Sequence, residues 1–222
     1  MNYTDFEKAF SPARLFKYKQ ACGGDNSKAL VLYRYNIKLC QKFYGVLNVF
    51  EVVLRNAIDV HYRAVLSDDD WINSQLQDGG LLENSPQKVK TLDLINSLNL
   101  QGKYSHDRLV SSVSLGFWTY MFNKKPFRLG GQNLLKIFPN KDFGVNQKTV
   151  FKDLQEIKNF RNKIAHHEAI CFDGSSNKSM DYAYEHYMLI LKYIHFLGYS
   201  ENHLFYGLDV LPVGVMRRIE TL

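Results

Sequence analysis

The sequence predicts an all-α fold, and two observations lead to it. Apolar residues recur at helical spacing over most of the chain, and no stretch alternates convincingly with the period of two that is typical of a strand. The composition, 45% hydrophobic and 23% charged, is that of a globular protein with enough apolar material for a core. A length of 222 residues fits one large domain, or one domain with an appended subdomain. We expect a single helical domain over residues 1–222, because no repeat or linker interrupts the pattern.

The first elements are long helices. Ser11-Pro12 predicts the start of a helix, with proline at its first position, and Gly23-Gly24 predicts its end. Asp25 can cap the next helix, whose apolar positions follow helical spacing. Gly45 then either interrupts that pattern or allows close packing. A second helical stretch is predicted over residues 46–66.

The middle of the chain is more broken. Three aspartates before Trp71 indicate a loop or a helix start, and Ser85-Pro86 predicts another helix. The apolar side of that helix is predicted to hold Val89, Leu92, Leu94, Ile95 and Leu98. Residues 109–122 are strongly apolar. Prolines and glycines predict loops over residues 123–146, around one short helix at 132–138.

Two further helical regions complete the expected bundle. Asn146 is predicted to cap a helix over about residues 147–167. After a polar loop at 171–178, helices are predicted over about residues 181–220. The first of them should end near Leu197, with Gly198 as its C-cap.

The charge and the cysteine content indicate which kind of partner and which cellular compartment to expect. The net charge of +6 favours a polyanionic partner, such as a nucleic acid. The three cysteines, Cys22, Cys40 and Cys171, are odd in number and lack metal-ligand spacing, which favours a reducing compartment. Neither a signal peptide nor an apolar run of membrane-spanning length is evident. We therefore expect a cytoplasmic protein without a membrane partner.

The segment from Arg161 to Glu168, Arg-Asn-Lys-Ile-Ala-His-His-Glu, holds the main chemical signal. A guanidinium can bind a phosphate through two parallel hydrogen bonds. Imidazole both gives and takes protons near neutral pH. Arginine beside two histidines therefore suits phosphodiester chemistry that needs no metal ion or other cofactor.

Helix geometry separates this motif from the core. Arg161 lies at the edge of an apolar stripe, whereas Asn162 and His166, four residues apart, lie almost opposite it. The stripe consists of Val150, Leu154, Ile157, Phe160 and Ile164. His166 should therefore face solvent, a cleft or another chain. Spacing alone gives a second Arg/His pair, Arg55 with His61, which matches the pattern equally well.

Non-catalytic interpretations exist for the same residues. Arg161 and Glu168 can form structural ion pairs at a solvated helix end. The aromatic helix that holds Tyr182 and Tyr187 can stack RNA bases, but such helices are more often core or dimer interface. The histidines at positions 186, 195 and 203 lack clustered carboxylate or cysteine partners, so no metal site is expected.

The motif and several further segments, in order over about residues 10–170, resemble the Abi-like proteins (abortive infection, AbiD/AbiF type), which in turn resemble HEPN ribonuclease domains. Besides residues 161–168, the resemblance rests on Tyr35-Asn36, Glu51-Val-Val-Leu-Arg-Asn-Ala-Ile58, Trp71, Ser114-Leu-Gly-Phe-Trp118 and Phe138-Pro139. It implies an all-α, HEPN-like helical bundle with additional helices and loops. It also implies a metal-independent endoribonuclease that stops phage propagation or is the toxin of a toxin–antitoxin pair. Such ribonucleases usually pair two Arg/His motifs across a dimer, which implies a homodimer with facing motif helices.

We hypothesise roles for the motif residues on RNA. His166 is the general base or acid, and Arg161 neutralises charge on the phosphorane oxygens, leaving a 2′,3′-cyclic phosphate. Asn162 binds the phosphate or fixes His166, and Lys163 helps to hold the RNA backbone. His167 orients one of these neighbours, contacts the substrate, or has no role.

Glu51 and Arg55, one helical turn apart, are expected to pair and to brace the motif helix, reaching Glu168 or His167. The alternative for Arg55 is a second phosphate contact. A competing hypothesis for the whole chain is a non-catalytic module that binds RNA or a protein and is regulated by a partner RNA or an antitoxin. A third is a structural helical dimer.

Overall fold

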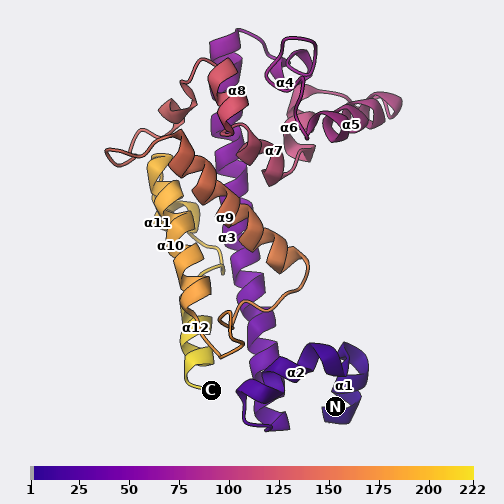
Figure 1. Ribbon diagram of the computed structural model, residues 1–222, viewed down its shortest axis with the longest axis vertical. Helices are drawn as coiled ribbons and strands as arrows, with labels where there is room; N and C mark the ends of the chain where they lie inside the picture. Colours follow the sequence, from indigo (N-terminus) through magenta and orange to yellow (C-terminus); the bar gives the residue numbers. More distant parts are fainter. Residues whose placement is uncertain (1–2) are drawn as a thin grey trace. The chain divides into compact units, whose positions relative to one another are not determined.

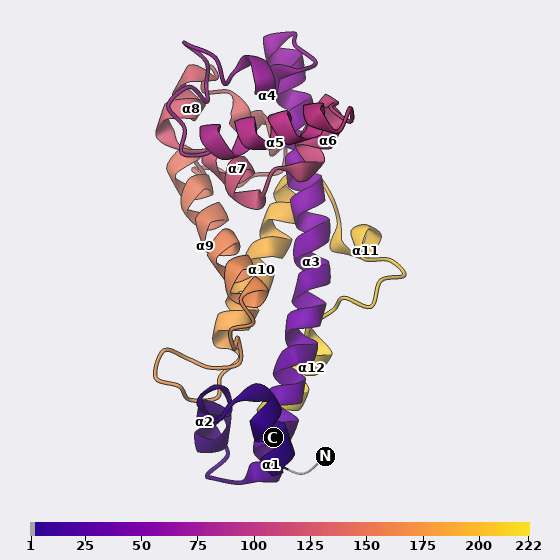
Figure 2. The same cartoon turned by 90° about the vertical axis from the view of Figure 1, so that its right-hand side faces the viewer.

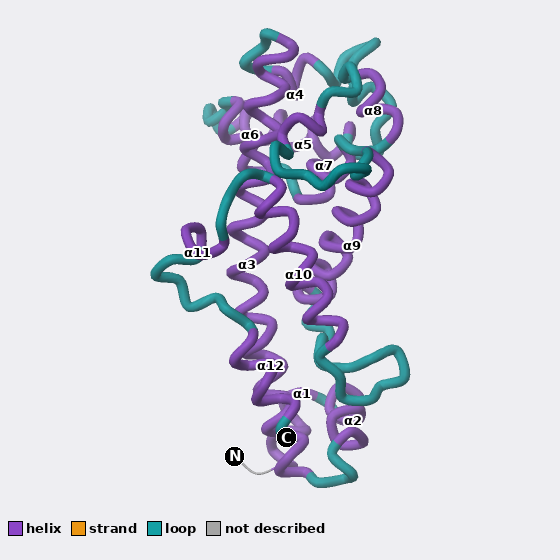
Figure 3. Tube along the Cα trace, turned by 90° about the vertical axis from the view of Figure 1, so that its left-hand side faces the viewer, coloured by secondary structure: helices purple, strands orange, loops and turns teal. Residues whose placement is uncertain are grey.

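The computed structural model describes residues 3–222 and is all-helical, as the sequence predicts (Figure 1). The helices are α1 Tyr3–Phe10, α2 Pro12–Ala21, α3 Asn26–Leu66, α4 Trp71–Ser74, α5 Lys88–Leu100, α6 His106–Ser112, α7 Leu115–Tyr120, α8 Lys124–Leu129, the 3₁₀ helix η1 Leu134–Ile137, α9 Gln147–Ala165, α10 Asp181–Phe196, α11 Glu201–Leu204 and α12 Val213–Glu220. No strand forms in residues 3–222, and helices and loops alternate along the tube in Figure 3. None of the helices in this part of the chain combines the length and apolar character that crossing a bilayer requires.

The chain groups into two compact units, which are described separately. Unit 1 comprises Met1–Asn48, Asn159–Leu191 and Asn202–Leu222, and unit 2 comprises Val49–Lys158 and Lys192–Glu201. Helices α3, α9 and α10 contribute residues to both units. The single domain that we expect from the sequence remains a prediction.

In unit 1, α1 and α2 lie beside the first half of α3 (Figures 1 and 2). The ring of Tyr33 on α3 joins them, because it packs against Phe6, Phe10 and Tyr18 with centroid distances of 5.6, 5.1 and 5.1 Å. Helix α1 is not among the elements predicted from the sequence. Aromatic packing of this kind stabilises a short helix that would be marginal in isolation.

The predicted start and end of α2 are confirmed. The Oγ atom of Ser11 accepts a hydrogen bond from the backbone N–H of Arg14, and proline occupies the first helical position. Gly23 and Gly24 follow the helix with positive φ. Asp25 then caps α3, because its Oδ1 atom accepts from the next helix's first backbone N–H groups. The cap at Ser11 places Arg14 in the first turn of α2.

Helix α3 continues through Gly45 over 41 residues, so the predicted interruption there is wrong. The other alternative, close packing, is what the structure has. A Cβ atom at Gly45 would overlap the side chain of Val210, which belongs to the same unit. Glycine therefore lets the segment before α12 approach α3.

In unit 2, helices α4 to α8 gather around the second half of α3 (Figures 2 and 3). Trp71 on α4 is fully buried against Tyr62, with a centroid distance of 4.8 Å. It also packs against Phe117 and Trp118 on α7, each at a centroid distance of 6.5 Å. These two rings come from the strongly apolar stretch 109–122, which is therefore core.

The loop-rich region 123–146 holds more helix than we predicted. The 3₁₀ helix η1 lies within the helix predicted at 132–138, but α8 was missed. Its signals are a cap at Asn123, whose Oδ1 atom accepts from the N–H of Lys125, and Pro126 in the first turn. A helix of this length has too few turns to show a hydrophobic period, so its proline resembles a loop residue in the sequence.

The helix predicted after Ser85-Pro86 begins later, at Lys88. The Oγ atom of Ser85 accepts from the N–H of Gln87 and forms a turn before the helix. Val89, predicted on the apolar side, is 69% exposed, whereas Ile95 is buried. Thr91, in the same first turn as Val89, is only 2% exposed, so this turn reaches the core through threonine rather than through the predicted valine.

The motif helix α9 begins as predicted, because the Oδ1 atom of Asn146 accepts from the N–H groups of Lys148 and Thr149. Its predicted apolar stripe is buried at every position: Val150, Leu154, Ile157, Phe160 and Ile164. The predicted end of α10 is also confirmed, since Gly198 follows it with a φ of 87°.

Candidate functional site

The motif lies where α9 ends, in unit 1. The helix stops at Ala165, slightly before the predicted end at residue 167, and His166 and His167 form the closing turn. Arg161 is half-buried, whereas residues 165–168 are exposed. His166 thus faces away from the core, as the helix geometry predicts.

The backbone of His167 closes the helix. Its N–H donates to the carbonyl of Ile164 at 3.0 Å, and the N–H of Glu168 donates to the carbonyl of Lys163 at 2.9 Å. This pair of bonds is a Schellman motif, in which the residue at the His167 position adopts the left-handed conformation. The φ of His167 is 59°. Histidine occupies this region more readily than most residues, although glycine is the usual choice.

Two long-range hydrogen bonds fix the segment that follows the helix. Arg14 on α2 donates from Nη1 to the backbone carbonyl of His167 at 3.0 Å. The N–H of Ile170 donates to the Oδ1 atom of Asn36 on α3 at 3.0 Å, and Asn36 is only 4% exposed. The turn that carries His166 is therefore held from both α2 and α3.

A cavity of about 720 Å³ opens beside this turn, entirely within unit 1. Its lining includes Phe10, Arg14, Tyr33, Asn36, Tyr44 and Arg161. None of the residues that line it, all in the described part of the chain, is acidic. With two guanidinium groups and no carboxylate, the cavity is suited to an anionic ligand that also has an apolar or aromatic part.

The structure brings some of the predicted site residues to this cavity and leaves others outside. Arg161 and His167 line it, whereas His166 and Asn162 do not. His166 lies on the adjacent exposed turn, and its N–H donates to the carbonyl of Asn162 at 2.9 Å. Asn162 and His166 thus keep the one-turn spacing that the sequence predicts.

Lys163 and Glu168 have different surroundings. The Nζ atom of Lys163 lies 4.5 Å from the ring centroid of Tyr182, a cation–π contact. Glu168 is exposed. Within residues 3–222, neither Arg161 nor Glu168 takes part in an ion pair, so the structural ion pairs of the non-catalytic interpretation do not form there.

Glu51 and Arg55 belong to unit 2, so their bracing of the motif stays a prediction. Arg55 donates from Nη1 to the backbone carbonyl of Ser111 at 3.5 Å, a long hydrogen bond. The partner of Arg55 in the second Arg/His pair, His61, is half-buried, and its Nε2 atom lies 2.8 Å from the Oδ1 atom of Asn133. This second pair is therefore tied into local contacts of unit 2.

Cys40 also lines the cavity, and its thiol is not a nucleophile near neutral pH. Burial raises the pKa of Cys40 to about 11, which keeps the sulfur protonated. The Nδ2 atom of Asn36 donates to its Sγ atom at 3.9 Å, a weak contact. Cys40 therefore lines the cavity as an uncharged side chain.

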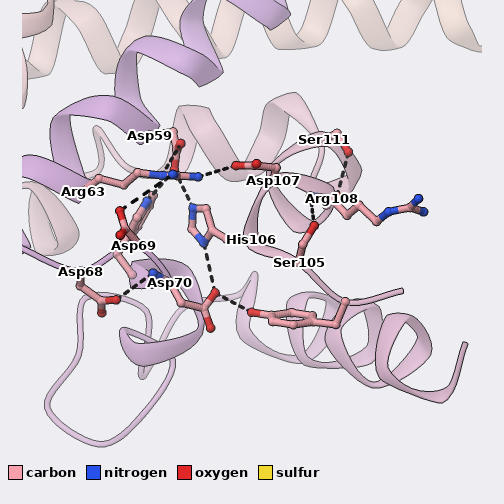
Figure 4. Close-up of polar contacts among 12 residues, drawn as sticks. Asp59, Arg63, Asp68, Asp69, Asp70, Ser105, His106, Asp107, Arg108 and Ser111 are labelled. Atoms are coloured by element: carbon pink, nitrogen blue, oxygen red, sulfur yellow. Dashed lines mark hydrogen bonds and ion pairs between the residues drawn. The ribbon is translucent and has the colours of Figure 1, made fainter. Parts of the chain in front are cut away.

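A second polar cluster, in unit 2, is structural (Figure 4). The Oδ1 atom of Asp59 on α3 accepts from Trp71 Nε1 at 2.8 Å and lies 2.7 Å from His106 Nε2. The other ring nitrogen of His106 lies 3.2 Å from Asp70 Oδ1. Asp59 also pairs with Arg63, whose Nε atom lies 3.0 Å from its Oδ2 atom. These bonds join α3, α4 and α6. The polar atoms involved are used in contacts within the cluster.

The charges in this cluster shift two pKa values in opposite directions. Burial by itself lowers the pKa of His106, but the hydrogen bond and charge of Asp59 outweigh it and raise the pKa. Burial by itself raises the pKa of Asp59, but hydrogen bonds from His106 and Trp71 outweigh it and lower the pKa. Both shifts favour the charged pair.

Metal-ligating side chains do not gather elsewhere in residues 3–222. No group of three or more His, Cys, Asp and Glu residues there can hold a metal ion. His186, one of the histidines considered in the sequence, stacks on Phe160 with a centroid distance of 4.5 Å. Its Nδ1 atom lies 2.7 Å from the backbone carbonyl of Tyr182.

Comparisons with protein-family models, curated proteins and solved structures find no match to this chain.

Sequence reasoning missed Arg14, which is remote from the motif in sequence and carries no signal of its own. The N-cap Ser11 predicts the helix α2 that carries Arg14, but it does not predict that Arg14 contacts the turn at His167. Asn36 had a weak signal, because Tyr35-Asn36 was one segment of the family resemblance. The cluster of Asp59 and His106 had none, since 47 residues separate the two side chains.

Proposed function

We propose that this protein is a metal-independent endoribonuclease that cleaves RNA to 2′,3′-cyclic phosphate ends through Arg161 and His166. One observation carries the proposal. Arg161 lines an open cavity with a second arginine and no acidic residue, and the exposed His166 lies on the turn that ends the same helix. An anion-binding group and a proton carrier are thereby presented together.

Arg161 is the phosphate-binding residue in this proposal. Its guanidinium has no ion-pair partner within residues 3–222, so it can hold two oxygens of a phosphate side by side. In the transition state the same contact stabilises the charge that develops on the phosphorane oxygens. The net charge of +6 adds a favourable long-range attraction for RNA.

His166 transfers the protons. As general base it takes the proton of the ribose 2′-hydroxyl while that oxygen forms a bond to phosphorus. The bond from phosphorus to the 5′-oxygen breaks, and the leaving oxygen receives a proton from a general acid. The products are a 2′,3′-cyclic phosphate and a free 5′-hydroxyl, so atoms and charges balance without a metal ion or cofactor.

Two proton carriers are needed, and each chain carries one His166 in its Arg161–His166 motif. We infer that a second copy of the chain supplies its own His166 as the acid, in a homodimer with facing motif helices. Asn162 positions His166 or the phosphate, and Lys163 holds the RNA backbone. His167 and Glu168 support the turn that carries His166.

The biological setting of this proposal rests on the family resemblance. An RNA-cleaving protein of this type acts in abortive infection or antiphage defence, as a toxin whose activity is restrained by an antitoxin or a regulatory RNA. Expression in a bacterial host tests this, because an active toxin slows growth and its His166→Ala variant does not.

The decisive experiment is cleavage of a labelled single-stranded RNA in EDTA, with the product ends identified. We expect wild type to leave 2′,3′-cyclic phosphates, and His166→Ala and Arg161→Ala to lose activity by at least about 100-fold. His203→Ala is the matched control, because His203 is an exposed histidine outside the motif. Retained cleavage in His166→Ala, or a strict requirement for a divalent metal, would refute the mechanism.

One observation favours a second function, a non-catalytic module that binds RNA or a protein. His166 is outside the cavity lining, so a ligand can fill the cavity without contacting it. A binding module predicts that Arg161→Ala weakens RNA binding while His166→Ala changes neither binding nor host growth. A purely structural dimer predicts no dependence on RNA.

A further inference from the structure

The cavity beside the motif is lined by two arginines, and one of them comes from α2. Arg14 is held in place, because its Nη1 atom donates to the carbonyl of His167 at 3.0 Å. A guanidinium has five N–H donors, so this bond leaves others for a ligand. Arg14 and Arg161 reach the cavity from different helices, α2 and α9. A fixed donor loses less conformational entropy when it binds than a freely rotating one.

Aromatic side chains line the same cavity as these two charges. Phe10, Tyr33 and Tyr44 line the cavity, and Tyr44 is 60% exposed. Bases of single-stranded nucleic acids stack on such rings, because every base has a π-face. The charges alone would suit any anion, but rings and guanidinium groups in the lining of one cavity suit an anion that is attached to a flat aromatic group.

Amide groups that line the cavity can form hydrogen bonds with the edge of a flat aromatic ligand. The Oδ1 atom of Asn36 is already used by the N–H of Ile170, whereas its Nδ2 atom has only the weak contact to Cys40. That amide can therefore donate to a ring nitrogen or carbonyl oxygen of a base. Gln41 adds a second amide to the lining. The volume of about 720 Å³ lies in the range of small-ligand sites, about 300–1,000 Å³.

We propose that this cavity is a nucleobase pocket, which takes an unstacked base of single-stranded RNA while Arg14 and Arg161 hold a phosphate of the same nucleotide. The proposal rests on the proposed function in that RNA is the ligand. It adds that the protein selects single-stranded over duplex RNA, because a paired and stacked base cannot enter the pocket. It also makes Arg14 a substrate-binding residue.

The test measures binding of a fluorescein-labelled 8-nucleotide single-stranded RNA by anisotropy, using full-length His166→Gln protein to prevent cleavage. Tyr44→Ala removes a stacking surface, and we expect the dissociation constant to rise about 10-fold or more. Ile37→Trp fills the cavity from α3, where Ile37 lines it, and should weaken binding at least as much. Circular dichroism of each variant verifies that it is folded.

Matched controls lie outside the pocket. Val60→Trp adds the same ring at an exposed position of the same helix, and Val60 is 66% exposed. Tyr199→Ala removes a tyrosine of similar exposure, 49% against 60% for Tyr44. Both controls should bind RNA within about 2-fold of the parent protein.

Arg14→Ala, a change inside the pocket, should reduce the salt dependence of RNA binding. The slope of log affinity against log salt concentration should become smaller by about 1.

Competition identifies the part of the nucleotide that is bound. Adenosine and uridine 5′-monophosphates should displace the labelled RNA at lower concentration than ribose 5-phosphate, because only the first two carry a base. Equal displacement by all three would overturn the nucleobase pocket and leave a phosphate site. Equal affinity for duplex and single-stranded RNA would also overturn it.

The two proposals fail in different ways. If cleavage depends on His166 but Tyr44→Ala and Ile37→Trp bind RNA as the parent does, the pocket proposal is wrong and the nuclease stands. If those variants lose RNA binding but wild type never cleaves RNA, the nuclease is wrong and the nucleobase pocket stands.

Discussion

His106 places its Nε2 atom 2.7 Å from the Oδ1 atom of Asp59, with both side chains buried in unit 2. Its other ring nitrogen, Nδ1, lies 3.2 Å from the Oδ1 atom of Asp70. A neutral imidazole has a single N–H and can donate to one of these carboxylates, whereas an imidazolium donates to both. The geometry therefore stabilises the protonated ring and raises the pKa of His106.

This relationship predicts a pH-dependent stability. The pKa of His106 is raised above 6.5 in the folded protein, so its contribution to the free energy of unfolding is complete below pH 6.5. The contribution is lost as the pH rises through the raised pKa. The pKa of Asp59 is lowered from 3.8, so its contribution is present above pH 3.8 and is lost as the pH falls through the lowered pKa. Urea unfolding at a series of pH values measures both losses.

Substitution separates His106 from other titrating groups. In His106→Gln, the decrease in stability above pH 6.5 should be absent, because no imidazolium remains to lose its proton. His61→Gln is the matched control, since His61 is another histidine of unit 2 that bonds to a side chain, Asn133. The control should keep the decrease. An identical pH profile in His106→Gln and wild type would contradict the prediction.

Substitution of Asp59 is predicted to lower the free energy of unfolding more than substitution of any other residue of this cluster. Asp59→Ala leaves the buried imidazole of His106 and the indole N–H of Trp71 without their shared acceptor. We expect unfolding free energy to fall by about 3–5 kcal/mol, as for other broken buried pairs. The control is Asp69→Ala, because Asp69 has a 97% exposed side chain 4.0 Å from Arg63. That change should cost less than about 1 kcal/mol. Equal losses in chemical denaturation would refute the assignment.

Asn36 is predicted to stabilise the segment after the motif helix. Asn36→Leu removes the acceptor of the buried Ile170 N–H. A buried N–H without an acceptor should lower the free energy of unfolding by about 1–3 kcal/mol. Asn56→Leu, an exposed change on the same helix, should alter stability by less than about 0.5 kcal/mol. Thermal unfolding of the two variants measures the difference. A neutral Asn36→Leu would show that the segment does not depend on this bond.

The sequence was enough to predict the parts of the site that depend on local pattern. The cap at Asn146, the buried stripe and the exposure of His166 all follow from the helical period of α9. Each is decided by residues within a few turns of one another.

The parts that sequence reasoning missed depend on contacts between distant segments. The bond from Arg14 to the carbonyl of His167 spans 153 residues, and it involves a backbone atom that no side-chain pattern reveals. The Asp59 and His106 pair was hidden for the same reason. In the sequence, His106 has only the features of the first residue of a helix. Its contact with Asp59 on α3 arises from the packing of unit 2. Local patterns predict which elements form, whereas these contacts require the arrangement of the elements.

The two adjacent histidines of the motif are predicted to have different functions. His167 adopts a left-handed conformation with a φ of 59°, and Arg14 bonds to its backbone carbonyl rather than to its ring. His167→Gly keeps that carbonyl and relieves the backbone strain, so stability should be unchanged or raised by up to about 1 kcal/mol.

RNA cleavage by His167→Gly should stay within about 3-fold of wild type, while His166→Gly should lose at least about 100-fold. Measuring both rates in EDTA, together with unfolding free energies, tests the division. Loss of cleavage in His167→Gly with unchanged stability would contradict it and assign the His167 imidazole, which also lines the cavity, a role in the reaction. Loss of stability would instead show that the ring supports the turn. Retained activity leaves His166 as the proton carrier of the motif and His167 as the residue that ends the helix.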